Sequence, residues 1–262
     1  GAHRGYLICD MIQWIYTIRP ELLQTMRFAI VEKHPDIRQA QIEYIHSRFG
    51  DDVKVEHFSS VSEIQTDYAF IISNEIFDAF PCELLKDNKI AIVTNHSILW
   101  QQAPQKLLDF AQKHRLKQGE IAVGYEAFAS EFNSLPRCDF VSFDYGEKYV
   151  RNDFSIRVYK EHQTYPLFDE ALKLEEVYQD SDITYDVNFA HVIEAFETQG
   201  FKLQGYMTQA RALVDFGIID ILGQFALQTT QDIYHREADK IKTLLAPTIM
   251  GDRFKMISLS KN

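Results

Sequence analysis

Short apolar segments alternate with a helix-like segment in the first third of the chain, and this alternation most restricts the folds that are open to it. Apolar runs at Arg27–Val31, Val53–Phe58 and Tyr68–Ser73 have the length of buried strands. Pro35–Arg48 separates the first two and predicts a helix, with a proline near the first turn, where its missing N–H does no harm. Alternating strands and helices predict an α/β fold with a parallel sheet.

The later segments predict more helices, more strands and one hairpin. We expect helices at Leu7–Met26, Pro104–Arg115, Tyr125–Leu135, Val187–Thr198, Thr208–Leu227 and Thr230–Leu245. We expect strands at Asp139–Asp144, Ser155–Tyr159, Phe201–Met207 and Phe254–Leu259, and a hairpin of Lys89–Val93 with Ser97–Trp100. No internal repeat or Gly/Ser-rich linker divides the sequence. We therefore expect one domain over residues 1–262, with insertions at about 86–136 and 147–185.

Charge and cysteine content exclude several classes of protein. The 262 residues include 38 acidic and 27 basic side chains, so the formal net charge is −11, which argues against a broad nucleic-acid-binding face. The three cysteines, Cys9, Cys82 and Cys138, form no CxxC pair and predict neither a metal site nor a disulfide framework. They suit a reducing compartment. No apolar run approaches the ~20 residues of a membrane helix, so we expect no membrane insertion.

Two features near the start of the chain suit a nucleotide-like ligand. Gly1 and Gly5 precede a predicted helix, and glycines there let the backbone approach a ligand at the helix N-terminus. Glu32 follows the first predicted strand, where nucleotide-binding α/β folds place an acid that binds ribose hydroxyls. Chance spacing of the glycines, and a charge favourable at a helix start, are the simpler interpretations.

The densest cluster of polar and aromatic side chains is Asn74–Pro81, directly after the strand at Tyr68–Ser73. The carboxyl ends of strands are where open α/β sheets bind ligands, and the carboxylates of Glu75 and Asp78 could hold a cation. If the chain were helical here, the spacing of three would place both on one face. The alternative is a capped turn, with Asn74 or Asp78 as the N-cap.

Three weaker motifs follow. Asp144-Tyr145-Gly146 ends another predicted strand and could face the same crevice, although a tight turn explains the glycine equally well. Taken alone, Asp182–Val187 and Thr208-Gln209 are typical of helix-capping segments. The sequence contains no GxSxG, GxxxxGK[ST] or HExxH motif.

Taken in order, these segments resemble the MidA-like family of S-adenosylmethionine-dependent methyltransferases, whose mitochondrial branch is a complex I assembly factor. The stretches that carry the resemblance span the whole chain: GAHRGYLICDMI at 1–12, IVEKHPDIRQAQ at 30–41, SNEIFDAFP at 73–81, FDYGEKY at 143–149, IRVYKEH at 156–162, SDITYDVNF at 181–189, TQARALVDFGI at 208–218 and PTIMGDRFK at 247–255.

The resemblance implies a class I (Rossmann-like) methyltransferase fold, with a mostly parallel seven-stranded sheet between helices, and S-adenosylmethionine as the cofactor. It places Gly1 and Gly5 in the loop under the cofactor and Glu32 on its ribose. It places Asn74, Glu75 and Asp78 beside the methyl group, and we assign these three a catalytic role, with Asn74 also contacting the cofactor. Pro81, Asp144, Tyr145, Asp182 and Gln209 are assigned to the substrate side; Thr184 and Asp186 match the same motifs without an assigned role.

The chain departs from the family pattern at several positions. His3 replaces the middle glycine of a GxGRG loop, and Ala122 and Ala212 replace a usual Glu and Phe. The chain also begins where the central first strand of the fold would end. A parallel sheet without its central strand would leave backbone groups unpaired, so we expect further residues before Gly1.

The resemblance implies methylation of a protein, with arginine of a respiratory-complex subunit as the expected acceptor. A planar guanidinium binds carboxylates in bidentate fashion, which suits Glu75 and Asp78. The alternative is a non-catalytic assembly factor that keeps the fold in order to bind such a subunit, and His3 favours it. In either case the expected partner is a protein, and no nucleic acid is expected.

Overall fold

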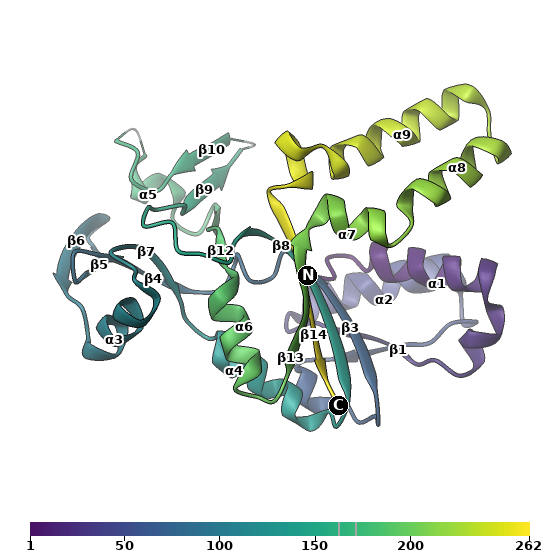
Figure 1. Ribbon diagram of the computed structural model, residues 1–262, viewed down its shortest axis with the longest axis horizontal. Helices are drawn as coiled ribbons and strands as arrows, with labels where there is room; N and C mark the ends of the chain where they lie inside the picture. Colours follow the sequence, from purple (N-terminus) through teal and green to yellow (C-terminus); the bar gives the residue numbers. More distant parts are fainter. Residues whose placement is uncertain (162, 171) are drawn as a thin grey trace.

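The computed structural model describes residues 1–161, 163–170 and 172–262, and its main sheet has five strands. Strand β8 (Cys138–Glu147) is central: β3 (Ala69–Asn74) and the short β12 (Val187–Asn188) pair with it in parallel, and β14 (Phe254–Lys261) pairs with it antiparallel. β13 (Lys202–Thr208) completes the sheet on the far side of β14 (Figure 1). The register sets Asn74 beside Phe143, so the carboxyl end of β3 lies next to Asp144.

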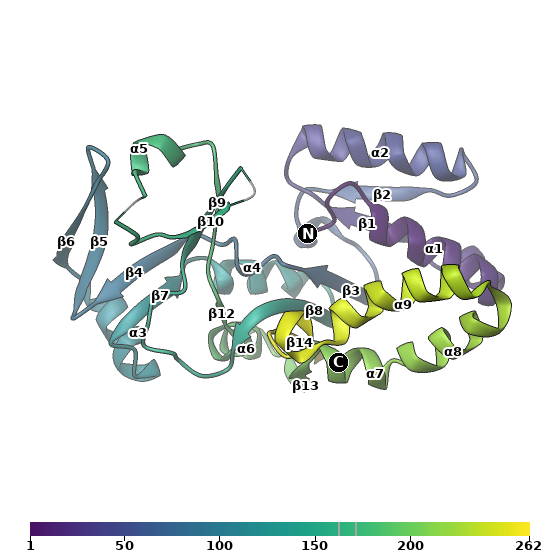
Figure 2. The ribbon, with the colours of Figure 1, turned by 90° about the horizontal axis from the view of Figure 1, so that it is seen from above.

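A second, two-stranded parallel sheet consists of β1 (Phe28–Val31) and β2 (Val55–Phe58), and Figure 2 shows it grouped with α1 and α2. The predicted seven-stranded, mostly parallel sheet is therefore wrong in its details for the described residues, although the α/β class is right. The strands form a two-stranded and a five-stranded sheet, because β1 and β3 share no hydrogen bonds. The larger sheet is mixed, because β14 runs opposite to both of its neighbours. The expectation of residues before Gly1 stays a prediction.

Two smaller sheets lie on the other side of the main sheet from α1 and α2 (Figure 1). The first is antiparallel, in the order β6-β5-β4-β7, and α3 (Gln105–His114) connects two of its strands. Its β5 (Lys89–Thr94) and β6 (Ser97–Gln102) are the predicted hairpin, whereas β4 (Cys82–Lys86) and β7 (Gln118–Ala122) were not predicted. The second sheet contains β9 (Arg157–Lys160), β10 (Gln163–Pro166) and β11 (Asp182–Thr184), and the short α5 (Leu174–Val177) lies between β10 and β11 in the chain.

The helices are shorter than predicted where glycine or proline intervenes. α1 (Tyr6–Ile18) ends before Pro20, and a 3-10 turn follows, because proline cannot continue the ladder of helical hydrogen bonds. The predicted helix at Thr208–Leu227 is divided at Gly217, whose φ of 87° belongs to the left-handed region. The remaining helices are α2 (Pro35–Phe49), α4 (Tyr125–Glu131), α6 (Phe189–Glu197), α7 (Gln209–Asp215), α8 (Ile218–Gln228) and α9 (Gln231–Leu245).

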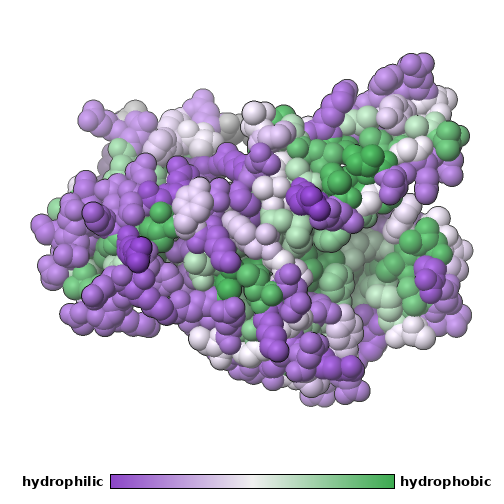
Figure 3. Space-filling model, viewed as in Figure 1, coloured by the Kyte–Doolittle hydropathy of each residue, from purple (hydrophilic) through white to green (hydrophobic). Residues whose placement is uncertain are grey.

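The helices leave apolar surface exposed in one region. α8 contains no buried residue, and Figure 3 shows apolar side chains over the α7–α9 region and over part of α1, with a hollow between them. The exposed residues include Leu7 and Trp14 of α1 and Ile219 and Ile221 of α8. Within the described ranges, no helix is both long enough and apolar enough to cross a membrane.

An aromatic core anchors the carboxyl end of β3. The rings of Phe77, Phe132, Phe140 and Phe196 are fully buried, and those of Phe140 and Phe196 stack with their centroids 5.1 Å apart. Phe77 lies in the segment that leaves β3, and its ring centroid is 5.3 Å from that of Tyr125 in α4. The Tyr125 hydroxyl also donates a 2.8 Å hydrogen bond to the Phe77 carbonyl. Burial of this ring therefore fixes the segment that carries Asp78.

Candidate functional site

The Gly1–Gly5 loop leads into α1 and leaves the start of that helix open. Gly5 is the N-cap residue, with a φ of 82°, and no side chain caps the helix. The amides of the first turn are therefore available to an acceptor. An ideal Cβ on Gly1 would lie 2.3 Å from the Asn74 carbonyl oxygen, so the loop passes directly against the end of β3. A loop this close to a strand end fits a cradle for a ligand.

A glutamine from α2 supports this loop. Gln41 is fully buried, and its Nε2 donates a 2.7 Å hydrogen bond to the His3 carbonyl oxygen. His3 itself has a φ of 45°, in the left-handed region that glycine adopts most easily. Gln41 therefore holds a strained part of the loop in place. The sequence did not single out this residue, although a glutamine four residues before the buried Ile45 on the same helix face was a usable signal.

Glu32 follows β1, and its backbone N–H continues the pairing with β2 by donating to the Phe58 carbonyl at 2.9 Å. One carboxylate oxygen accepts a 2.9 Å hydrogen bond from the His34 N–H. The other oxygen has no hydrogen-bond partner within the described part of the chain. Glu32 thus presents an open acceptor at the carboxyl end of a strand, which is the geometry expected for binding hydroxyl groups.

The Asn74–Pro81 segment is a turn, not a helix. The condition under which one helical face would hold both Glu75 and Asp78 is therefore not met. The alternative of a turn is right, but neither Asn74 nor Asp78 is the N-cap of a helix. The segment turns sharply, because Glu75 has a φ of 49°. Glu75 is exposed and accepts a 2.8 Å hydrogen bond from the Asn74 amide, whereas Asp78 is only 4% exposed.

Asp144 holds this turn in position. It is fully buried, and its Oδ2 accepts hydrogen bonds from the backbone N–H groups of Ile76 and Phe77, at 3.2 and 2.9 Å. Its Oδ1 accepts a 2.9 Å bond from the Tyr145 N–H. Burial, with the nearby charge of Asp78, raises the pKa of Asp144 to about 8, although these N–H donors oppose the rise. The structure therefore uses Asp144 to support the turn.

One carboxylate oxygen of Asp78 accepts a hydrogen bond, and the other has no partner among the described residues. The Tyr145 hydroxyl donates to its Oδ2, and its Oδ1 is buried with no hydrogen-bond partner in the described ranges. Burial raises the pKa of Asp78, and the hydrogen bond from Tyr145 opposes this rise. The close approach of Gly1 to the Asn74 carbonyl oxygen places the glycine loop beside the turn that carries Asp78. A buried, unpaired carboxylate oxygen is costly unless a ligand satisfies it.

The other predicted site residues lie in varied surroundings. Pro81 is exposed, and its carbonyl accepts a 2.7 Å bond from the Val123 N–H. Asp182 is exposed on β11, opposite Tyr159 of β9. Gln209 is buried, and its Nε2 donates to the Leu244 carbonyl at 3.0 Å, which ties α7 to the end of α9. These contacts give Gln209 a packing role, and substrate roles for Pro81, Asp182 and Gln209 stay predictions.

The sequence of residues 1–207 matches a family model described as "Putative S-adenosyl-L-methionine-dependent methyltransferase". The chain belongs to this family. The match covers the glycine loop, Glu32 and the turn at Asn74–Pro81, and it confirms the expected cofactor and the expected class of enzyme. The finer resemblance to MidA-like proteins is compatible with this family.

Two solved structures share the fold. One is a protein from Burkholderia thailandensis described as a "likely methyl transferase" and bound to S-adenosyl-homocysteine. It is 22% identical, with a TM-score of 0.80, over 99% of this chain and 70% of that one. A native structure of a protein of the same superfamily from that organism is 20% identical, with a TM-score of 0.79, over 99% of this chain and 72% of the other. A search of curated proteins found no match.

We expect Gln41→Leu to weaken binding of S-adenosyl-homocysteine about tenfold, the free-energy scale of one hydrogen bond that holds the loop. Calorimetric titration measures this affinity. Gln39→Leu is the matched control, because Gln39 lies on the exposed face of the same helix and, among the described residues, its side chain bonds to Glu43 alone, at 2.9 Å. Equal losses in the two variants would contradict a specific role for Gln41 in the loop.

Proposed function

We propose that this protein transfers a methyl group from S-adenosylmethionine to a side-chain nitrogen of another protein, with arginine as the acceptor. The observation that carries the proposal is the unpaired Oδ1 of Asp78, which is buried beside the exposed Asn74 and Glu75 at the carboxyl end of β3. A donor N–H from a substrate would satisfy this oxygen. A guanidinium supplies several such donors in one plane, together with a positive charge that matches a carboxylate.

The residues around the Gly1–Gly5 loop fit the cofactor. The uncapped start of α1 and the close approach of Gly1 to Asn74 leave backbone room for it, and the free oxygen of Glu32 can accept hydrogen bonds from ribose hydroxyls. When bound, S-adenosylmethionine supplies a methyl group activated by the positive sulfonium. The protein must then hold the acceptor nitrogen in line with that methyl group and exclude water.

The proposed step is an in-line displacement. The lone pair of the acceptor nitrogen forms a bond to the methyl carbon, and the bond from carbon to sulfur breaks with its electron pair retained by sulfur. The acceptor nitrogen gives up one proton, which Asp78 accepts at Oδ1. Tyr145 orients the Asp78 carboxylate through its hydrogen bond to Oδ2. Glu75, which is exposed on the same turn, adds negative charge that attracts a cationic acceptor.

The partner of the proposed reaction is a protein, and the resemblance to MidA-like proteins points to a subunit of a respiratory complex. A net charge of −11 is compatible with a basic acceptor peptide.

The rival proposal is a non-catalytic assembly factor. The observation that favours it is His3, a non-glycine residue held at a φ of 45° inside the glycine loop.

Mass spectrometry separates these proposals. The purified protein is incubated with methyl-labelled S-adenosylmethionine and a cell extract enriched in basic proteins, and labelled sites are then mapped. The methyltransferase proposal predicts label on arginine nitrogens. Label only on lysine would overturn the choice of acceptor, and cofactor binding without any label would support the assembly-factor proposal.

A further inference from the structure

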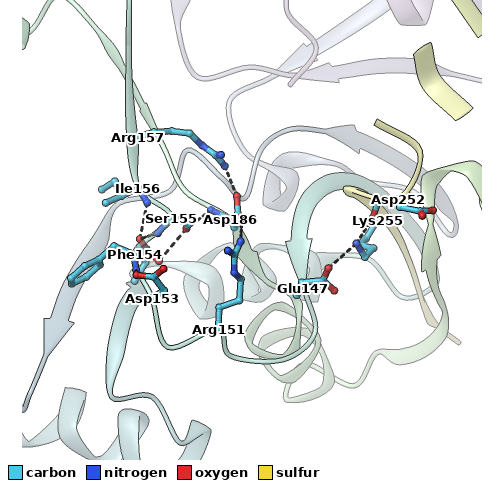
Figure 4. Close-up of polar contacts among 11 residues, drawn as sticks. Glu147, Arg151, Asp153, Phe154, Ser155, Ile156, Arg157, Asp186, Asp252 and Lys255 are labelled. Atoms are coloured by element: carbon cyan, nitrogen blue, oxygen red, sulfur yellow. Dashed lines mark hydrogen bonds and ion pairs between the residues drawn. The ribbon is translucent and has the colours of Figure 1, made fainter. Parts of the chain in front are cut away.

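One carboxylate binds two arginines beside the Asn74–Pro81 turn. Asp186 accepts a 2.8 Å hydrogen bond from Nη1 of Arg151 and a second bond from Nη2 of Arg157 (Figure 4). The pair with Arg157 is sheltered, with side chains only 15% and 16% exposed, whereas the Arg151 side chain is 53% exposed. The Asp186 N–H also donates to the Ser155 hydroxyl at 2.8 Å. Asp186 is thus a fixed anchor, and Arg157 is its sheltered partner.

Arg157 connects Asp186 to the candidate site, because it also contacts Tyr145. Its guanidinium carbon lies 5.0 Å from the centroid of the Tyr145 ring, within the range of a cation–π contact. The hydroxyl of that ring donates to Asp78. Strand pairing sets this geometry, because Arg157 of β9 lies opposite Thr184 of β11, two residues before Asp186. The contacts therefore run without interruption from Asp186 through Arg157 and Tyr145 to Asp78.

We propose that Arg157, anchored by Asp186, is a positioning residue that holds Tyr145 in the orientation in which its hydroxyl binds Asp78. The inference rests on the proposed function, because it gives Arg157 a task in preparing the carboxylate that accepts the proton. Arg151 shares Asp186 but has no ring contact with Tyr145 among the described residues. This difference between two arginines on one carboxylate makes the inference testable.

The positive charge of Arg157 also acts on Asp78. The titratable and charged groups around this carboxylate are Glu75, Asp144, Tyr145, Arg157 and Tyr185. Arg253 also contacts the Tyr145 ring, with its guanidinium carbon 5.5 Å from the ring centroid. Burial and the charge of Glu75 raise the pKa of Asp78, whereas the Tyr145 hydrogen bond and the charge of Arg157 lower it. Loss of Arg157 removes one direct opposing charge and frees the ring that supplies the hydrogen bond. Asp78 would then take up its proton at higher pH.

The test compares Arg157→Gln with Arg151→Gln. Each variant removes one guanidinium from Asp186, so a merely structural role of the ion pairs would move both alike. Protein labelled with carboxyl-¹³C aspartate is titrated by NMR, and the Asp78 signal is identified by its absence in Asp78→Asn. We expect the titration midpoint of Asp78 to rise by about half a pH unit or more in Arg157→Gln and to stay unchanged in Arg151→Gln. Equal midpoints in the two variants would overturn the inference.

Of two further variants, one tests whether Arg157 acts through the Tyr145 ring, and the other replaces Arg157→Gln if that variant does not fold. If Arg157 acts through the ring, its substitution should have a smaller effect in a Tyr145→Phe background; an undiminished effect contradicts positioning through Tyr145. If Arg157→Gln does not fold, Arg157→Met, which keeps the length of the side chain, replaces it: the inference expects a raised Asp78 midpoint there too, and an unchanged one overturns it. The NMR titration needs no methyl acceptor. A wild-type protein that transfers no methyl group would therefore count against the proposed function alone.

Discussion

Asp78→Asn should lower the rate of methyl transfer about 10²-fold or more while leaving affinity for S-adenosyl-homocysteine nearly unchanged. The asparagine keeps the shape of the side chain and one oxygen that can still accept the Tyr145 hydrogen bond. It cannot take up the proton that the acceptor nitrogen loses, and it cannot pair with a cationic acceptor. Turnover with the acceptor identified by mass spectrometry is the quantity to measure.

Asp139→Asn is the matched control for this prediction. Asp139 also accepts a hydrogen bond from a tyrosine, Tyr68, at 2.8 Å, but it lies near the start of β8, away from the strand's carboxyl end. Its substitution should leave turnover within about twofold of the wild type, as expected for a change outside the site. Glu75→Gln shows whether the exposed carboxylate shares the task. Full activity in Asp78→Asn would remove this residue from the catalytic set.

The stability of the protein should fall as the pH rises from about 4 to about 8, because of Asp144. The pKa of this carboxyl is raised to about 8 in the folded protein, chiefly by burial, from an ordinary value of 3.8. A raised carboxyl pKa means that folding favours the protonated form. The contribution of protonated Asp144 to the free energy of unfolding is complete below about pH 4 and is lost as the pH rises through about 8. A tenfold change in proton affinity corresponds to about 1.4 kcal/mol, so the upper bound of the effect is about 6 kcal/mol.

Asp144→Asn tests this directly by urea denaturation at several pH values. The amide cannot ionise, but its single oxygen cannot satisfy all three N–H groups that Asp144 now accepts. We expect the variant to be about 1–3 kcal/mol less stable than the wild type at pH 5, with the difference shrinking toward pH 8.5. A difference that does not change with pH would show that Asp144 stays ionised in the folded protein.

The sequence predicted the parts of the site that depend on strand ends. Glu32 and the Asn74–Asp78 turn follow apolar runs that form β1 and β3, and Asp144 and Tyr145 lie toward the carboxyl end of β8. A buried run of apolar residues is a strong signal, and the residues after it necessarily lie at the edge of the sheet. The family motifs then supplied the cofactor, which no local pattern specifies.

What the sequence could not predict depends on contacts between distant residues. Asp144 can support the turn only when β3 and β8 pair, because it lies 68 and 67 residues after Ile76 and Phe77, whose N–H groups it binds. The free Oδ1 of Asp78 likewise follows from this pairing. β4 (CELLK) and β7 (QGEIA) were missed because they carry charged residues and, in β7, a glycine, which are unfavourable in strands. The antiparallel pairing of β4 with β7 overrides these weak preferences. Gln41 and Arg157 were missed because their roles depend on partners that are distant in the sequence, the His3 carbonyl for Gln41 and Asp186 and Tyr145 for Arg157.

We expect the Gly1–Gly5 loop and Glu32 to form the cofactor site of the proposed methyltransferase. Calorimetric titration of the wild-type protein and Glu32→Ala with S-adenosyl-homocysteine tests it most directly. We predict one binding site per chain in the wild type, and an affinity lower by about 10- to 100-fold in Glu32→Ala, the scale of hydrogen bonds to a charged carboxylate. No binding by the wild type, or equal affinity in the two proteins, would contradict the claim.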